Sequence, residues 1–170
     1  MEKKLINHLL FNTPFDFDKN LENINFEGFI KIASKQLLIP AIYVNIKRKR
    51  LEKFFPDDLI SYLNQIYKLN LERNKILLDE VKFLNKLLIK SNLKYVFIKG
   101  SSYILNNLFY DIGERMIGDI DILAEEKDSL KIKELIEKNG YYSKEENDFF
   151  LDEIKHYNRQ INKNKIFAVE

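Results

Sequence analysis

Asp119 and Asp121 are the residues whose types and spacing could most directly do chemistry. In a β-strand the side chains at i and i+2 point to the same face, so these two carboxylates would stand side by side. Carboxylates that close repel each other unless a cation lies between them, and Mg²⁺ binds carboxylate oxygens together with water and phosphate oxygens. The pair therefore predicts a magnesium site, with two metal ions, that serves phosphoryl or nucleotidyl transfer.

A turn that precedes this pair could hold a triphosphate. Gly100 would let the backbone approach a phosphate closely, and Ser101 adds a hydroxyl and an N–H group at the start of a predicted helix. Lys99 is a cation beside the turn, and Arg115 precedes Asp119 by four residues and carries a planar fork of N–H donors. We expect Lys99, Gly100, Ser101 and Arg115 to bind the phosphates of a nucleotide.

Each of these features has a plainer explanation when it stands alone. An Asp-x-Asp pair on the exposed face of an edge strand discourages aggregation. A Gly-Ser pair is an ordinary turn from a strand into a helix, and a single loop arginine is often part of a surface salt bridge. The functional interpretation depends on the combination of the three features in this order.

The spacing of apolar residues predicts the elements that would position these side chains. Helical spacing dominates residues 26–90, and Pro56 and two acids mark the start of the longest helix, which runs to about Ser91. The following pattern predicts a buried strand, a short helix, a loop, a second strand and a helix, at Tyr95–Ile98, Ser101–Tyr110, Asp111–Gly118, Asp119–Ala124 and Lys127–Lys138.

The remaining part of the chain predicts a helix cap and a hairpin. Asn139-Gly140 is a typical left-handed C-terminal cap. The segments His156–Ile161 and Ile166–Val169 flank Asn162–Lys165 as the strands of a hairpin flank its turn. The fold class predicted is α+β, with a helical segment over residues 1–92 and a small mixed sheet with helices over residues 93–170.

The stretch FIKGSSYILNNLFYDIGERMIGDIDILAEE resembles the polymerase-beta type nucleotidyltransferase superfamily, and within it the bacterial branch described broadly as nucleotidyltransferase family proteins. The resemblance implies a polymerase-beta-like core over residues 93–170. It also implies a third acid on a neighbouring strand, which acts as a metal ligand and as the base for the attacking hydroxyl. The segment KIFAVE is similar to that strand and makes Glu170 the candidate. Because members of this branch usually continue beyond that acid, we expect a core that is truncated at its C-terminus.

The resemblance implies an enzyme that transfers a nucleoside monophosphate from a nucleoside triphosphate to an acceptor hydroxyl and releases pyrophosphate. The acceptor is a small molecule, a protein or an RNA. An alternative is a catalytically inactive binding or regulatory module with the same fold, for example a toxin–antitoxin type partner. A third possibility is a nucleic-acid binder that uses the basic run Lys47–Arg50 and loses affinity steeply with salt.

Composition limits the classes of partner and metal site that the protein can have. With 28 basic and 26 acidic residues, no global field calls for a polyanionic partner. The sequence has no cysteine, and its two histidines, His8 and His156, make a poor metal set, so we interpret both as structural. No apolar run approaches the length of a membrane span, so we expect no membrane partner and a cytoplasmic location.

Overall fold

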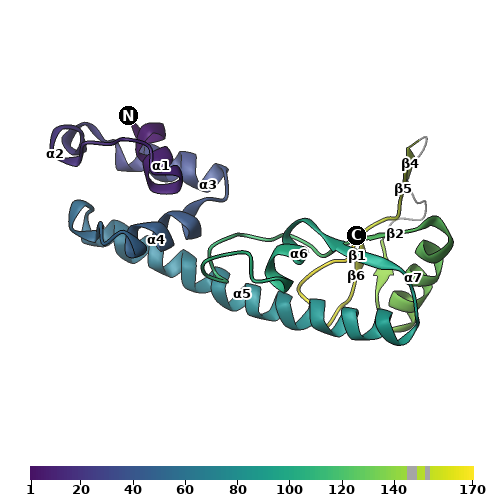
Figure 1. Cartoon of the computed structure of the whole chain (residues 1–170). Coiled ribbons are helices and arrows are strands. Elements are labelled where there is room, and N and C mark those ends of the chain that lie inside the picture. The colour runs from purple at the N-terminus through teal and green to yellow at the C-terminus, as the bar shows by residue number, and fades with distance from the viewer. Residues whose placement is uncertain (145–148, 152–153) are drawn as a thin grey trace. The chain divides into compact units, whose positions relative to one another are not determined.

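The computed structural model describes residues 1–144, 149–151 and 154–170, and residues 149–151 and 154–156 by their backbone alone. Figure 1 shows the helices and strands, coloured by residue number from the N-terminus to the C-terminus. They are α1 (Glu2–Phe11), α2 (Phe17–Asn20), η1 (Leu21–Asn23), α3 (Phe26–Lys35), α4 (Ile39–Arg48), η2 (Glu52–Phe54), α5 (Asp57–Lys90), β1 (Tyr95–Ile98), α6 (Lys99–Leu105), β2 (Asp121–Ala124), α7 (Glu126–Lys138), β3 (Tyr142–Ser143), β4 (Phe149–Leu151), β5 (Ile154–His156) and β6 (Gln160–Ile161). Helices with short antiparallel sheets make the chain an α+β protein, as the sequence predicts.

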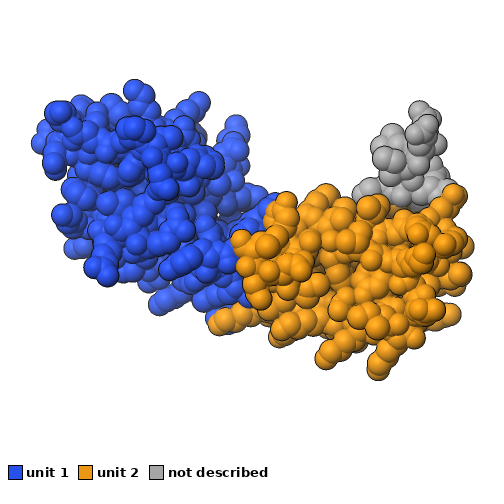
Figure 2. All heavy atoms as spheres, viewed as in Figure 1, with its two compact units in different colours: residues 1–74, 109–116 blue, residues 75–108, 117–170 orange. Residues whose placement is uncertain are grey.

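The chain divides into two compact units, which Figure 2 shows in different colours. Unit 1 comprises residues 1–74 and 109–116, and unit 2 comprises residues 75–108 and 117–170. Helix α5 contributes its first half to unit 1 and its second half to unit 2. The sequence places a domain boundary at residue 92, just beyond the end of α5. The compact units instead divide within that helix, and the domain assignment itself stays a prediction.

Unit 1 is built from amphipathic helices around one apolar core. In α1 the apolar residues Leu5, Ile6 and Leu9 recur at helical spacing and are buried, and α1 packs against α3 and α4. The Asn25 side chain caps the start of α3 by accepting a hydrogen bond from the Gly28 amide. No single helix in the described part of the chain is both long and apolar enough to cross a membrane, and α3 with α4 reaches that length and composition only as a pair bent by 119°.

Helix α5 begins and ends where the sequence predicts. Pro56 immediately precedes it, where a missing N–H group costs nothing, and Asp57 and Asp58 place negative charge at the positive end of the helix dipole. Its second half buries Leu77, Val81, Leu84 and Leu88 in unit 2, a stripe at helical spacing. The helical interpretation of residues 26–90 is therefore confirmed.

The central strands of unit 2 are β1 and β2, which pair antiparallel with Ile98 opposite Asp121 and Val96 opposite Leu123. The bounds predicted for β1 are confirmed, but the prediction of a buried strand is wrong. Val96 is 51 % and Leu123 55 % exposed, because this two-stranded sheet is covered on only one of its faces. Phe97 and Ile120 point to the covered face and are buried.

The neighbouring elements show smaller differences from the prediction. Helix α6 ends at Leu105 rather than Tyr110, and β2 starts at Asp121 rather than Asp119. Helix α7 extends over Glu126–Lys138, within one residue of the prediction, and Gly140 has the left-handed φ of 87° that the predicted cap requires.

Near the C-terminus, Val169 forms single backbone bridges with two other segments. Gln160 and Val169 exchange backbone hydrogen bonds of 2.8 and 2.9 Å as an isolated antiparallel bridge, so the two segments of the predicted hairpin meet there. The strand β6 pairs with β3, and no strand is assigned at residues 166–169. On the other side, Ile120 forms a parallel bridge with Val169. The last residues of the chain therefore lie beside the start of β2.

Candidate functional site

The turn between β1 and α6 is shaped by Gly100 and Ser101. A Cβ atom at Gly100 would lie 2.6 Å from Cγ2 of Ile117, so packing alone requires glycine there. Ser101 is fully buried, and its hydroxyl donates to the carbonyl of Ile98 at 2.7 Å. Both residues hold the turn in place, and their predicted contact with phosphate stays a prediction.

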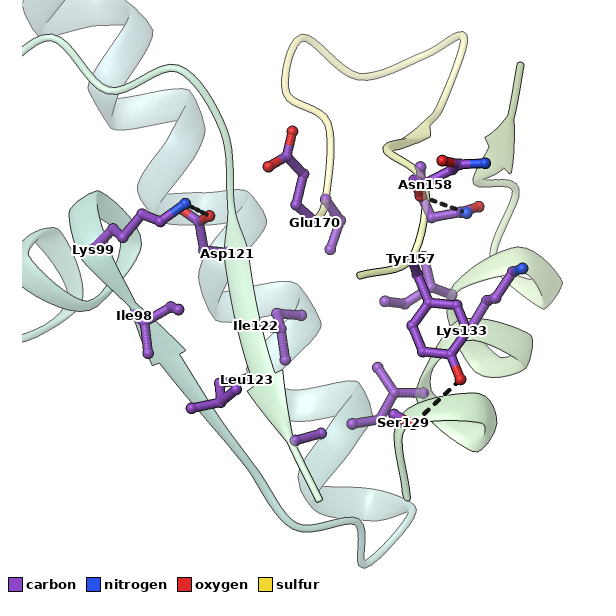
Figure 3. A pocket seen from close by; sticks show the side chains of 15 residues that line it. Ile98, Lys99, Asp121, Ile122, Leu123, Ser129, Lys133, Tyr157, Asn158 and Glu170 are labelled. Carbon is purple, nitrogen blue, oxygen red and sulfur yellow. Dashed lines mark hydrogen bonds and ion pairs between the residues drawn. The ribbon is translucent and has the colours of Figure 1, made fainter. Parts of the chain in front are cut away.

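The turn presents Lys99 to Asp121. Lys99 has a positive φ of 51°, and its Nζ donates to Oδ1 of Asp121 at 2.5 Å, as Figure 3 shows. Ile98 and Asp121 are cross-strand partners, so the residue after Ile98 lies beside the carboxylate. The pKa of Lys99 is raised by its hydrogen bond to Asp121 and by the charge of that carboxylate, with smaller contributions from Asp119 and Glu170.

Asp121 is less accessible than the sequence suggests. Two aspartates on one face of a strand are expected to face solvent or a metal. The Asp121 side chain is only 6 % exposed, whereas Lys99 is 62 % exposed. The carboxylate is paired with the ammonium of Lys99, and its predicted contact with a metal stays a prediction.

Asp119 and Glu170 meet at a second cation. Nη2 of Arg159 lies 4.0 Å from Oδ2 of Asp119, and its Nε lies 3.6 Å from Oε1 of Glu170. The backbone of Glu170 is fixed beside β2, because its N–H donates to Ile120 O at 2.9 Å and its carbonyl accepts from Ile122 N at 2.7 Å. The structure thus brings Glu170 to the segment next to Asp119 and Asp121.

The donor chemistry of this cluster fits a divalent cation. Asp119, Asp121 and Glu170 are carboxylates on two adjacent backbone segments, and carboxylate oxygens are the protein ligands that Mg²⁺ prefers. Within the described residues, however, no group of three or more such side chains has ligand spacing. Lys99 and Arg159 instead lie beside these carboxylates and neutralise part of their charge.

Arg115 belongs to unit 1, whereas the other predicted phosphate-binding residues belong to unit 2. Its carbonyl accepts hydrogen bonds from Nδ2 of Asn70 at 3.0 Å and of Asn74 at 2.8 Å. Its guanidinium carbon lies 6.0 Å from the centre of the Phe109 ring. The predicted contact of Arg115 with a triphosphate stays a prediction.

A cavity of about 280 Å³ lies next to the carboxylate cluster. Lys99, Asp121 and Glu170 contribute to its lining, and Ile122 points away from the Lys99–Asp121 pair toward Tyr157 (Figure 3). Most of the remaining lining is apolar, with isoleucines of β2 and α7. The cavity is large enough for part of a small-molecule substrate beside the charged cluster.

The sequence pattern of one protein family, described as uncharacterised nucleotidyltransferase, matches residues 22–170. The chain belongs to this family. The resemblance predicted from residues 97–126 is thereby confirmed. No curated protein and no solved structure matches the chain. Membership of a nucleotidyltransferase family suggests a transferase with a nucleoside triphosphate as a substrate, and divalent metals are typical of such enzymes.

The sequence did not predict the contacts of three residues in this family member. Arg159 lies beside Asp119 and Glu170, and Asn70 and Asn74 bind the carbonyl of Arg115. Arg159 lies in no motif and is far in sequence from Asp119, so only the fold brings them together. Asn70 and Asn74 are buried polar residues one helical turn apart in α5, at positions where polar side chains are uncommon. That pairing in a helix is a signal that could have identified them.

Three residues of the basic run and His8 have hydrogen-bond partners within the structure. In the basic run, Lys47 Nζ pairs with Oε1 of Glu52 at 2.6 Å, and Lys49 Nζ donates to carbonyl oxygens of α1. Arg48 donates to the side chain of Asn45 at 2.5 Å. Nδ1 of His8 lies 2.5 Å from the backbone carbonyl oxygen of Thr13, and its structural interpretation stays a prediction. The side chain of His156 lies outside the described part of the chain.

Proposed function

We propose that the chain transfers a nucleoside monophosphate from a nucleoside triphosphate to an acceptor hydroxyl, and that unit 2 is a polymerase-beta-like core. The observation that carries the proposal is the position of Glu170, whose backbone is hydrogen-bonded to Ile120 and Ile122 on either side of Asp121. Three carboxylates on adjacent strand segments, beside the turn that carries Lys99, support this assignment in a nucleotidyltransferase family.

Each residue of the cluster would have a defined part in the reaction. Asp119, Asp121 and Glu170 would hold Mg²⁺, which when bound favours attack by the acceptor and departure of pyrophosphate. The carboxylate of Glu170 would take the proton of the acceptor hydroxyl. A bond forms between that oxygen and the α-phosphorus, and the bond from the α-phosphorus to the bridging oxygen breaks, so that pyrophosphate leaves.

The phosphates of the nucleotide would bind at the charged cluster, and the rest of the substrates would bind beside it. Lys99 is exposed and carries its charge beside the carboxylates, where it can reach phosphate oxygens, and the turn at Gly100 and Ser101 is the rest of the phosphate site predicted within unit 2. The cavity, with its apolar lining, has room for the nucleoside or for part of the acceptor. A small molecule, a protein or an RNA all remain acceptable as the acceptor.

One observation favours the inactive binding module as a second candidate. Asp121 is paired with Lys99, and the described residues hold no set of carboxylates at ligand spacing. A protein that had lost turnover would keep its acids neutralised by its own cations in this way. Fold and family membership alone do not decide between the two functions.

The products formed from labelled nucleotides test the proposal. The chain is incubated with Mg²⁺ and each of the four ribonucleoside triphosphates labelled at the α-phosphorus, with water as the default acceptor. The transferase predicts pyrophosphate together with a nucleoside monophosphate, free or attached to the chain, and no such product from an Asp119→Asn, Asp121→Asn variant. Formation of a nucleoside diphosphate, or equal product from the Asp119→Asn, Asp121→Asn variant, contradicts the proposed reaction.

A further inference from the structure

Every carboxylate of the proposed metal site has a side-chain cation beside it. Nζ of Lys99 contacts Oδ1 of Asp121 at 2.5 Å. Arg159 approaches the other two, with 4.0 Å to Asp119 and 3.6 Å to Glu170. Two positive charges therefore neutralise part of a group of three negative ones in the chain without metal.

The cations are the movable members of this cluster. Lys99 is 62 % and Arg159 55 % exposed. Arg159 can leave its pairs for water at little cost, whereas Lys99 can leave the buried Asp121 only where another cation takes its place. The acids are fixed more firmly. Asp121 lies within β2, and the backbone of Glu170 is hydrogen-bonded on both sides to Ile120 and Ile122. Entry of another cation would therefore displace Lys99 and Arg159 and leave the carboxylates in place.

We propose that Lys99 and Arg159 are placeholder cations, which neutralise the three acids before substrate binding and move to the phosphates of the incoming nucleotide. This inference rests on the proposed function and adds Arg159 to its site. An ammonium group and a divalent cation at the same carboxylate repel each other, whereas a triphosphate beside the acids offers both side chains new negative partners. Metal alone would bind weakly, and metal and triphosphate would strengthen each other's binding.

The two roles predict opposite effects of one substitution. Neutralising a placeholder cation removes a competitor of the metal, so metal alone binds more tightly. The same substitution removes a phosphate partner, so the triphosphate binds more weakly. A residue that only stabilised the fold would not shift these two affinities in opposite directions.

The test consists of two titrations. In the first, Mn²⁺ alone is added, and its binding is measured from the electron paramagnetic resonance signal of free Mn²⁺. In the second, inorganic tripolyphosphate is added at saturating Mn²⁺. The variants are Lys99→Gln and Arg159→Gln. The matched control is Lys127→Gln, which removes the same charge from an exposed pair with Glu125 in unit 2. We expect both variants to bind Mn²⁺ about tenfold more tightly than the wild type, roughly 1.4 kcal/mol, and tripolyphosphate about tenfold more weakly. The control should match the wild type in both titrations.

The outcomes separate this inference from the proposed function. Mn²⁺ affinity that is unchanged or weaker in both variants overturns the placeholder role. If Lys99→Gln does not fold, because it leaves the buried Asp121 without its partner, Arg159→Gln decides the question, since that side chain is exposed. If the Asp119→Asn, Asp121→Asn variant binds Mn²⁺ as tightly as Arg159→Gln does, the metal site and with it the proposed function fail as well.

Discussion

Ile98 and Asp121 are directly opposite each other in the antiparallel pair of β1 and β2. This register explains why Lys99, the residue that follows Ile98, reaches Oδ1 of Asp121 at 2.5 Å. A shift of the pairing by one residue would turn Asp121 to the covered face of the sheet, where Phe97 and Ile120 are buried. The chemistry of the site therefore depends on the packing that fixes this register.

Gly100 is a first test of that packing. In Gly100→Ala the new Cβ would lie 2.6 Å from Cγ2 of Ile117, so we expect unfolding free energy to fall by about 1–3 kcal/mol in urea titrations. Gly118→Ala is the matched control, because a Cβ there meets nothing within 4 Å, and it should change stability by less than about 0.5 kcal/mol. In a double-mutant cycle, Ile117→Ala should reduce the cost of Gly100→Ala. A cost equal to that of the control would show that packing does not require the glycine.

Glu80 connects three segments of unit 2. It is buried, accepts a hydrogen bond from the hydroxyl of Tyr141 and pairs with Nζ of Lys165 at 2.5 Å. We expect Glu80→Gln to lower the free energy of unfolding by about 1–3 kcal/mol, because the charge-assisted partner of Lys165 is lost. Glu134→Gln, an exposed change on α7, should be nearly neutral in the same urea titration. Equal stability of the two variants would mean that the buried pair contributes nothing.

Tyr67 should make the stability of unit 1 depend on alkaline pH. Its hydroxyl donates to both carboxylate oxygens of Asp111, at 3.1 and 3.0 Å. Burial, the hydrogen bond to Asp111 and the charge of Asp111 raise the pKa of Tyr67 to about 12. The folded chain therefore holds this proton more tightly than the unfolded chain, in which tyrosine titrates near pH 10. The contribution is complete below about pH 10 and is lost as the pH rises to about 12.

The comparison with Tyr67→Phe isolates this effect from the titration of other groups. The wild type should be the more stable below about pH 10, and its advantage in urea unfolding should narrow steadily above that pH. An advantage that stays constant over this range would contradict a raised pKa of Tyr67.

Local patterns predicted the elements better than the contacts between them. The β-branched and aromatic run before Gly100 gave the bounds of β1, and Pro56 with two acids marked the start of α5. Four consecutive apolar residues do not show whether a strand is covered on one face or two, so the exposure of Val96 was not predictable from them. That depends on how many helices pack on the sheet.

In the candidate site, too, the local motifs were predictable and the contacts between distant segments were not. Asp-x-Asp and the turn before it are local, and the sequence shows them directly. The pairing of Lys99 with Asp121 depends on the register of two strands, and the approach of Arg159 to Asp119 and Glu170 depends on the bridges of Val169 near the C-terminus. These contacts join residues far apart in the chain, and no spacing rule within one segment specifies them.

The most direct test of the central claim is thermal unfolding of the wild type and of the Asp119→Asn, Asp121→Asn variant, with and without Mg²⁺, in the presence of each ribonucleoside triphosphate. A nucleotide at a hundred times its dissociation constant adds about 2.7 kcal/mol, a rise in midpoint of roughly 5 to 10 °C. We predict a Mg²⁺-dependent rise of this size for at least one nucleotide, absent in the variant, whose fold without ligand is checked by circular dichroism. No rise with any nucleotide, or an equal rise in the variant, would contradict a nucleotidyltransferase site at these carboxylates.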